Sequence, residues 1–325
     1  MEKLFLSNRS NLTSISRVII GTNQYGRSKK EEQAFHQLDL FFDELGCDTI
    51  DSATVYGETT PGVSRSLEVI GKWLKNRDRS SVKIISKGCC YKLNAPSVPR
   101  LTPEALKQDI YQSLDALGTD YIDIFLLHRD DPRIPTGEMI DALNEHIDAG
   151  LIRIAGASNW WSSRIAEANA YAESHGLSGL SVSEIQWSYV PQTPGHEILR
   201  EENNGWMTDN ELAAYSRMQL PVLSYFAQAR GYIPKYLSGR LKGTSAEEFD
   251  NPVSRARAER AAEIARKTGY STTEISLAYL LNTFTHACVL VGASSDDQLR
   301  EAIRCADIDL TPDQMAYLRG SEIIG

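Results

Sequence analysis

Short β-branched or apolar runs recur along the whole chain, and longer segments with many polar residues separate them. The eight runs cover residues 18–20, 48–50, 82–86, 123–127, 152–157, 182–185, 222–224 and 289–291. None of them alternates strictly between apolar and polar positions, and this is typical of strands buried on both faces of a parallel sheet. We therefore predict eight short buried strands.

The segments between these runs carry helix signals. At Thr102-Pro103-Glu104 a capping threonine precedes a proline in the first turn, and Gly118 follows the last periodic residue, so a helix is predicted over 103–117. Further helices are predicted over residues 139–149, 162–175, 273–281 and 297–305, and a charged, alanine-rich one around 255–267.

Eight strands that alternate with helices favour a single-domain (β/α)₈ barrel of the α/β class spanning residues 1–325. A doubly wound sheet is disfavoured, because no Gly-x-Gly-x-x-Gly turn follows the first strand. Two segments, 188–209 and 226–252, are rich in Gly, Pro and polar residues. We expect them to be long loops at the active-site mouth of the barrel. Disorder is expected at most in the first dozen residues.

Charge and composition exclude several classes of protein. The 325 residues carry a net charge of −9, and the pI is near 5.3, so neither nucleic acid nor an anionic membrane is an expected partner. No run approaches the roughly 20 apolar residues of a membrane helix, and residues 1–16 lack the apolar core of a signal peptide. Five cysteines without Cys-x-x-Cys spacing indicate reduced thiols, so we expect a cytoplasmic protein. No metal is expected, because His196-Glu197 lacks the second histidine of a zinc-protease motif and residue 200 is Arg.

Polar side chains at the ends of barrel strands point into the mouth, where barrel enzymes do their chemistry. Asp51, Lys87 and His128 directly follow the second, third and fourth runs. Tyr56 comes five residues after Asp51. Singly, the Asp could be a helix cap, the Tyr a packing residue and the His a hydrogen-bonded core residue. Lys87 is harder to explain, because a lysine ending a buried apolar strand needs a charged partner, which Asp51 can supply.

These four residues suit proton transfer to a carbonyl group. A free tyrosine has a pKa of about 10, and a neighbouring lysine ammonium lowers it by favouring the phenolate. Asp51 would keep Lys87 protonated and hold its ammonium towards Tyr56. Tyr56 could then donate a proton to a carbonyl oxygen while hydride arrives at carbon, and His128 would orient that oxygen.

At these residues the chain resembles the aldo-keto reductase superfamily. Asp48-Thr-Ile-Asp-Ser-Ala-Thr-Val-Tyr-Gly57 is similar to the segment with the family's catalytic Asp and Tyr, and 114–129 to the segment that leads to its His. Lys87 falls where the family has its lysine. The resemblance runs from about residue 18 to residue 306 and fills all four catalytic positions in order.

The resemblance also implies a nicotinamide cofactor, NADP by family habit, with NAD still open. Gly156-Ala-Ser158-Asn159 resembles the family's Gly-x-Ser-Asn, whose Ser and Asn hold the nicotinamide carboxamide. The implied cofactor residues are Gly21, Thr22, Ser158, Asn159, Gln186, Tyr225, Phe226, Gln228, Arg230, Gly292, Ser294, Ser295 and Gln298. Trp160 is the implied substrate-wall residue.

The sequence departs from the family pattern in three ways. Phe226 stands where many members have a serine, Gly292 and Gln298 stand where several carry Lys and Arg for the 2′-phosphate, and Ala302 replaces a frequent asparagine. The loop after the eighth run still leaves amide groups at a helix N-terminus, which is a phosphate site.

The leading hypothesis is an NADP(H)-dependent reductase of aldehydes or ketones, with sugar and aryl carbonyls both as candidates. Because the superfamily includes potassium-channel β subunits, a nicotinamide-binding regulatory subunit with little turnover is a second hypothesis. A third is a barrel isomerase or aldolase in which Lys87 forms a Schiff base. The sequence expects a small carbonyl or alcohol substrate and leaves the oligomeric state open.

Overall fold

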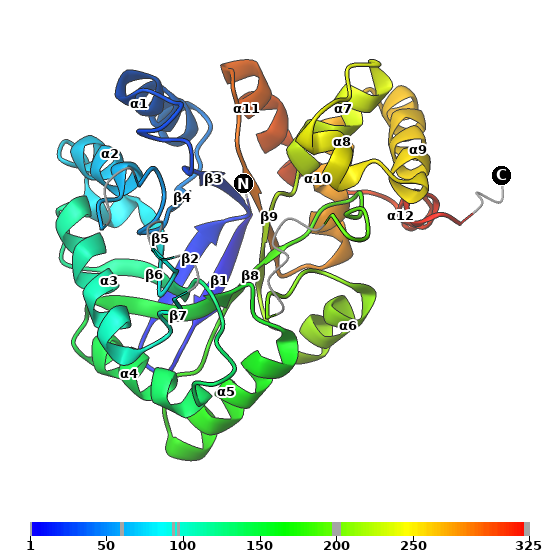
Figure 1. Ribbon diagram of the computed structural model, residues 1–325. Coiled ribbons are helices and arrows are strands. Elements are labelled where there is room, and N and C mark those ends of the chain that lie inside the picture. The colour runs from blue at the N-terminus through cyan, green and yellow to red at the C-terminus, as the bar shows by residue number, and fades with distance from the viewer. Residues whose placement is uncertain (1, 59–61, 93–94, 96–97, 197–202, 322–325) are drawn as a thin grey trace.

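Eight parallel strands close into a barrel at the centre of the molecule, with helices packed around its outside (Figure 1). The computed structural model describes residues 2–58, 62–92, 95, 98–196 and 203–321. Around the barrel the strand order is β10, β3, β4, β5, β6, β7, β8 and β9. These strands are β3 (Val18–Gly21), β4 (Thr49–Asp51), β5 (Lys83–Gly88), β6 (Ile122–Leu127), β7 (Ile152–Ser158), β8 (Ser183–Gln186), β9 (Val222–Tyr225) and β10 (Ala287–Val291). The predicted (β/α)₈ barrel is confirmed, and each strand end lies within two residues of its predicted place.

Helices follow the strands. They are α1 (Glu31–Asp39), α2 (Arg65–Leu74), α3 (Pro103–Leu117), α4 (Thr136–Asp148), α5 (Ser162–His175), α6 (Asp209–Met218), α7 (Tyr232–Leu237), α8 (Thr244–Phe249), α9 (Pro252–Thr268), α10 (Thr272–Thr283), α11 (Asp296–Ile303) and α12 (Pro312–Arg319). α3 begins as predicted, because the Thr102 side chain accepts a hydrogen bond from the Ala105 amide. It ends at Gly118, whose φ of 64° is left-handed. None of the described helices is long and apolar enough to cross a membrane.

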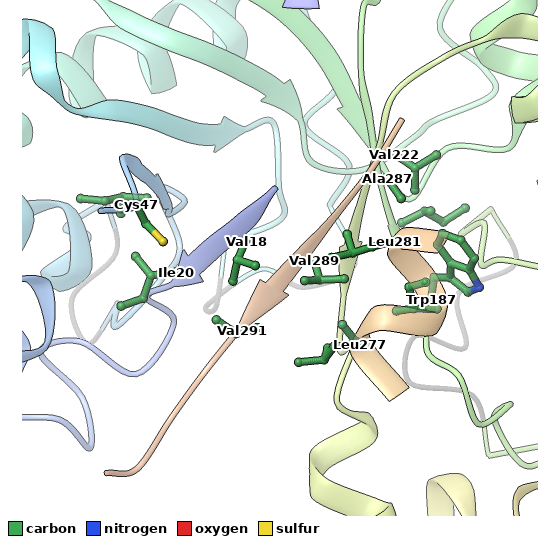
Figure 2. Packing of buried hydrophobic residues seen from close by; sticks show 14 of the residues in the cluster. Val18, Ile20, Cys47, Trp187, Val222, Leu277, Leu281, Ala287, Val289 and Val291 are labelled. Carbon is green, nitrogen blue, oxygen red and sulfur yellow. The ribbon is translucent and has the colours of Figure 1, made fainter. Parts of the chain in front are cut away.

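Alternation along the strands divides the core into two layers. Ile19, Ile124 and Leu290 belong to a cluster inside the barrel, while their chain neighbours face the helices. In the outer layer, Leu277 and Leu281 of α10 pack beside Val289 of β10 (Figure 2). Burying one such leucine stabilises the fold by about 2 kcal/mol. This two-sided burial explains why the strand runs lack a strict alternation of apolar and polar residues.

An antiparallel hairpin, β1 (Lys3–Ser7) and β2 (Leu12–Ser16), precedes the barrel. Leu4, Leu6 and Ile15 join the interior cluster, so the hairpin closes the end of the barrel where the strands begin. The expectation that disorder was possible here is wrong. Buried and exposed residues alternate along β1, as in a half-buried strand.

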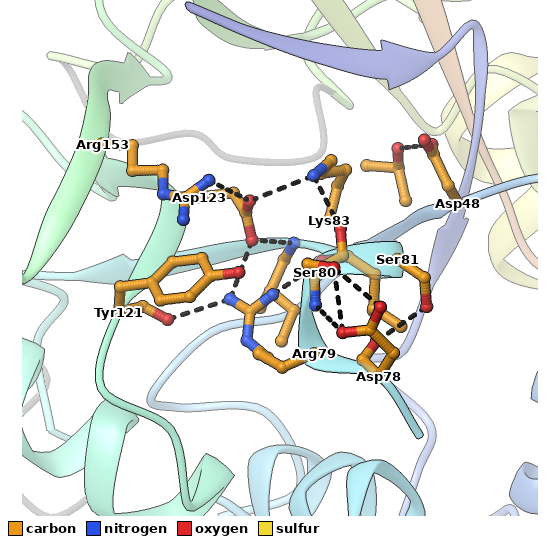
Figure 3. Close-up of polar contacts among 12 residues, drawn as sticks. Asp48, Asp78, Arg79, Ser80, Ser81, Lys83, Tyr121, Asp123 and Arg153 are labelled. Atoms are coloured by element: carbon orange, nitrogen blue, oxygen red, sulfur yellow. Dashed lines mark hydrogen bonds and ion pairs between the residues drawn. The ribbon is translucent and has the colours of Figure 1, made fainter. Parts of the chain in front are cut away.

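A charged network lies at the same end of the barrel (Figure 3). The fully buried Asp123 carboxylate of β6 accepts a 2.8 Å bond from the Arg79 guanidinium and a 3.1 Å bond from the Ile84 amide. The Lys83 ammonium lies 3.8 Å from it. The Arg79 and Arg153 guanidiniums also lie over the Tyr121 ring, at 4.1 and 3.8 Å. Because this network is far from the strand ends that carry the candidate site, we assign it to stability.

The two long segments follow strands β8 and β9. Within 188–209, the described residues 188–196 and 203–208 form no helix. Trp206 forms an isolated β-bridge with Gln186. Segment 226–252 is different from the prediction, because it contains a 3₁₀ turn (Ala229–Gly231), α7 and α8. These helices are only six residues long, too short for periodicity to reveal.

Candidate active site

Strand alternation directs a set of polar side chains into the barrel near the ends of the strands. Lys87 lies two residues after the interior Ile85, and Glu184 lies two residues after the interior Val182. Asp51 follows Ile50, which faces outward, so its side chain points inward. These three residues come from strands β5, β8 and β4.

Lys87 is fully buried, and its ammonium lies at the centre of the set. It donates to the Asp51 carboxylate and to the Ser52 carbonyl (3.1 Å). Burial alone lowers the pKa of Lys87, but attraction to Asp51 and Glu184 outweighs this effect and raises it above its usual value. Lys87 therefore remains a cation, as the sequence predicted for a lysine that Asp51 holds.

Tyr56 lies in the turn after β4, with its phenol oxygen 3.4 Å from the Lys87 ammonium. Burial raises the pKa of Tyr56, and the attraction of Lys87 opposes that shift only in part. The sequence argument gave the effect of Lys87 the correct sign, but it left out burial, which dominates. The phenol is therefore neutral and holds a proton that it can donate.

His128 directly follows β6, and its peptide amide donates to the Gly88 carbonyl at 2.8 Å. Its ring centroid lies 6.1 Å from that of Tyr56, edge to face. Burial, with smaller contributions from the Arg129 and Lys87 charges, lowers the pKa of His128 well below its ordinary value. Its buried Nδ1 has no hydrogen-bond partner among the described residues. A neutral imidazole at this position can donate one hydrogen bond.

Glu184 is a member of the set that sequence reasoning missed. Its side chain is 2% exposed, and its Oε2 lies 3.3 Å from the Lys87 ammonium. Burial, followed by repulsion from Asp51, raises the pKa of Glu184 well above its usual value. A glutamate inside the buried run 182–185 was the signal, because an acidic residue there needs a partner.

A cavity of about 730 Å³ opens above this set and extends towards the N-terminus of α11. Most of the sequence-predicted site residues line it. They are Gly21, Thr22, Asp51, Tyr56, His128, Ser158, Asn159, Tyr225, Phe226, Gln228, Arg230, Gly292, Ser294 and Gln298. Lys87 lies beneath the cavity.

Three predicted residues lie elsewhere. Trp160 is 1% exposed and does not line the cavity, so its expected place at the substrate wall is wrong. Gln186 instead lines a separate cavity of about 370 Å³ and accepts a 2.8 Å bond from Gln192. Ser295 caps α11 by accepting from the Gln298 amide at 3.3 Å. Residue order along a strand does not specify these side-chain directions.

Polar groups gather at the end of β7, beside the catalytic candidates. Asn159 has a left-handed φ of 64°, which turns its amide towards the barrel axis. Its Nδ2 donates to the His128 carbonyl (3.1 Å) and to the Ser158 hydroxyl (3.0 Å), and its Oδ1 accepts from the Tyr225 phenol (2.5 Å). Two amide-binding side chains and an aromatic ring therefore meet at one point of the cavity wall.

The far end of the cavity lies at the N-terminus of α11. The Gly292 amide donates to the Gln228 side chain at 3.3 Å, and the Ser294 amide donates to Gln298 at 2.9 Å. Backbone amides at a helix N-terminus form a site for anionic groups such as phosphate. An added Cβ at Gly292 would meet no atom within 4 Å, so the approach to these amides is open.

The loop after β9 bends sharply to form one wall of the cavity. Phe226, Ala229 and Arg230 all have left-handed φ angles between 46° and 53°, which strain non-glycine residues. The Arg230 guanidinium pairs with Glu248 and lies 4.5 Å from the Phe226 ring centroid. Arg230 therefore reaches the cavity already paired with a carboxylate.

Sequence reasoning also missed several lining residues between the two ends. They are Asn23, Gln24, Arg129, Lys235, Thr272, Thr273, Ser276 and Glu301. Asn23, Gln24 and Arg129 lie in loops, and the others lie in the short helix α7 or in α10 and α11.

No metal-binding group was found in the part of the chain that the structure describes, where a group means three or more His, Cys, Asp or Glu side chains. Residues 197 and 200, which bear on the zinc-motif comparison, lie outside the described residues.

Comparison with known proteins gives one consistent family. The sequence model of the Aldo/keto reductase family matches residues 17–323. The aldo-keto reductase dtxS3 of Metarhizium robertsii is 28% identical, over 94% of this chain and 87% of its own length. An aryl-alcohol dehydrogenase [NADP(+)] of Phanerodontia chrysosporium is 26% identical, over 90% of this chain and 77% of its own length.

A solved structure has the same fold. It is that of Tm1743, a thermostable aldo-keto reductase in complex with the inhibitor epalrestat. It superposes with a TM-score of 0.71 at 22% identity, covering 98% of this chain and 99% of that one.

Proposed function

The chain belongs to the aldo/keto reductase family, and from this premise we propose that it uses NADPH to reduce an aldehyde or ketone, with Tyr56 as the proton donor. Family membership makes it an NAD(P)H-dependent oxidoreductase. The observation that carries the finer proposal is the 3.4 Å contact between the Tyr56 phenol and the buried Lys87 ammonium, next to the cavity.

Each residue of the set has a definite task in this proposal. Tyr56 is neutral and gives its proton to the carbonyl oxygen, and the Lys87 cation stabilises the phenolate left behind. Asp51 holds Lys87 in place. The neutral His128 ring orients the carbonyl oxygen by a hydrogen bond.

The described residues fit a nicotinamide dinucleotide. Ser158 and Asn159 would hold a carboxamide, the Tyr225 ring would stack on the nicotinamide, and the α11 amides would hold phosphate. When bound, the reduced cofactor supplies the hydride. The name of the Phanerodontia chrysosporium relative supports NADP as the cofactor and an aryl carbonyl as the substrate class. A cytoplasmic location is part of the proposal, supported by an odd, sparse set of five cysteines without Cys-x-x-Cys spacing.

Two alternative functions, a Schiff-base enzyme and a regulatory subunit, fit the site less well. A Schiff-base mechanism needs a lysine that is readily deprotonated, whereas Asp51 and Glu184 raise the pKa of Lys87. A regulatory subunit would bind the cofactor and turn over slowly, and the complete Asp51, Tyr56, Lys87 and His128 set favours the enzyme instead.

The test is to measure NADPH and NADH binding by fluorescence, and cofactor oxidation with para-nitrobenzaldehyde and with an aldose. We expect NADPH to bind more tightly than NADH, and the aryl aldehyde to be reduced. Cofactor binding without turnover across a carbonyl panel would favour the regulatory subunit, and binding of neither cofactor would refute the proposal.

A further inference from the structure

Two carboxyl groups share one ammonium beneath the cavity. Asp51 forms an ion pair with Lys87, and the Glu184 Oε2 lies 3.3 Å from the same ammonium. The Asp51 and Glu184 side chains are each 2% exposed, and that of Lys87 is 0% exposed. Water therefore cannot screen the charges within this cluster.

The charges do not balance if both carboxyl groups are ionised. Two carboxylates and one ammonium would leave one net negative charge on side chains that are almost fully buried, which is strongly unfavourable. The largest charge effects on Glu184 are those of Asp51 and Lys87. The Arg129 charge acts on His128 and Tyr225.

The remaining groups around the cluster are neutral. Tyr56 and Tyr225 both have a pKa raised by burial, and burial lowers the pKa of His128. Neutrality of the whole cluster therefore requires a proton on one of the two carboxyl groups.

The contacts indicate which carboxyl group holds that proton. The Asp51 and Glu184 carboxyl groups both approach the Lys87 ammonium, and two buried carboxyl groups that share one site are not both ionised. Asp51 accepts a direct hydrogen bond from the Lys87 ammonium. Glu184 Oε2 has no aligned hydrogen bond, although the ammonium is 3.3 Å away. Asp51 is therefore the carboxylate, and Glu184 is the acid.

We propose that Glu184 is a protonated carboxylic acid at neutral pH and that it positions Asp51 and Lys87 by donating a hydrogen bond to the Asp51 carboxylate. Its part in catalysis rests on the proposed function, because it acts on Tyr56 only through Lys87 and Asp51. An ionised Glu184 would place a second negative charge near a phenol that must become a phenolate, so a neutral Glu184 favours proton donation.

The first experiment is infrared spectroscopy of the purified full chain at neutral pH. The carbonyl stretch of a protonated carboxyl group is well separated from carboxylate bands. We expect such a band in the wild type and its loss in Glu184→Gln. Glu274→Gln is the matched control, because Glu274 is also a buried glutamate but pairs with Arg304 outside the cluster. No band in the wild type, or a band that survives in Glu184→Gln, would overturn the proposal.

The second experiment compares pH profiles of kcat in Glu184→Gln and Glu184→Leu. Glutamine is a neutral donor, so its profile should lie within about 0.3 pH units of the wild type. Leucine cannot donate to Asp51, so we expect kcat to fall roughly tenfold, with most of that loss absent in Glu184→Gln. If Glu184 is ionised, Glu184→Gln removes a negative charge near Tyr56 and should shift the profile down by about one unit or more.

The two experiments separate the two proposals. The infrared band needs no turnover, so it decides the state of Glu184 even if no carbonyl is reduced. An active reductase without the band contradicts the role of Glu184 alone.

Discussion

Replacing Lys87 with methionine tests the charge arrangement beneath the cavity. The change keeps the length of the side chain but removes the ammonium that Asp51 and Glu184 share. Removing one partner of a buried ion pair costs about 3–5 kcal/mol of unfolding free energy, because the remaining group must either stay charged without a partner or take up a proton. We expect a loss of this size at neutral pH.

The loss should depend on pH, and its sign follows from the two carboxyl groups. Burial raises the pKa of Asp51 and of Glu184, and Lys87 opposes both shifts. Without Lys87, both acids are protonated in the folded protein, one proton more than in the wild type. A carboxyl group whose pKa is higher in the folded than in the unfolded protein stabilises the fold. This contribution is complete below the unfolded pKa of about 4 and is lost as the pH rises through the folded pKa. The deficit of Lys87→Met should therefore grow by about 1.4 kcal/mol per pH unit above that value.

Urea unfolding of wild type and Lys87→Met at several values between about pH 5 and pH 8 measures this slope. Lys83→Met is the control, because Lys83 lies on the same strand but approaches Asp123 at the other end of the barrel. An equal deficit at every pH would refute the reasoning, since it would mean that no extra proton is bound on folding.

Three further variants test the barrel itself. Gly156→Ala should destabilise the protein by about 1–3 kcal/mol, because the new Cβ would lie 2.4 Å from the Val182 carbonyl oxygen; an unchanged thermal midpoint would contradict this. Asp123→Asn should lower the free energy of unfolding in urea by about 3 kcal/mol, because Arg79 loses its carboxylate partner. A loss below about 1 kcal/mol would mean that this buried network contributes no more than an exposed ion pair. Ile15→Ala should cost about 2–4 kcal/mol by leaving a cavity under the hairpin; a neutral result would mean that the hairpin does not close the barrel.

The fold was largely predictable because parallel barrel strands are buried on both faces. Short β-branched or apolar runs located all eight strands, and Thr102, Pro103 and Gly118 marked the ends of α3. The prediction left out α12, although Thr311-Pro312 at its start repeats the pattern of α3. The six-residue helices α7 and α8 gave no periodic signal.

The site was predictable where position in a strand fixes direction. Asp51 and Lys87 end strands, and alternation alone directs them inward. Trp160 and Gln186 were misplaced, because the direction of a side chain near a loop depends on tertiary packing. Glu184 was overlooked because it lies within an apolar run, where burial and shared charge become visible only in three dimensions.

The proton-donor role of Tyr56 is the central claim, and Tyr56→Phe tests it most directly. The measurement is kcat for NADPH oxidation with para-nitrobenzaldehyde, together with NADPH affinity by fluorescence. Tyr215→Phe is the control, because Tyr215 is a buried phenol that bonds Ser183 outside the cavity. We expect Tyr56→Phe to lose about 10²–10⁴-fold in kcat, while it binds NADPH as the wild type does and the control keeps its turnover. Turnover of Tyr56→Phe at the wild-type rate would contradict the account.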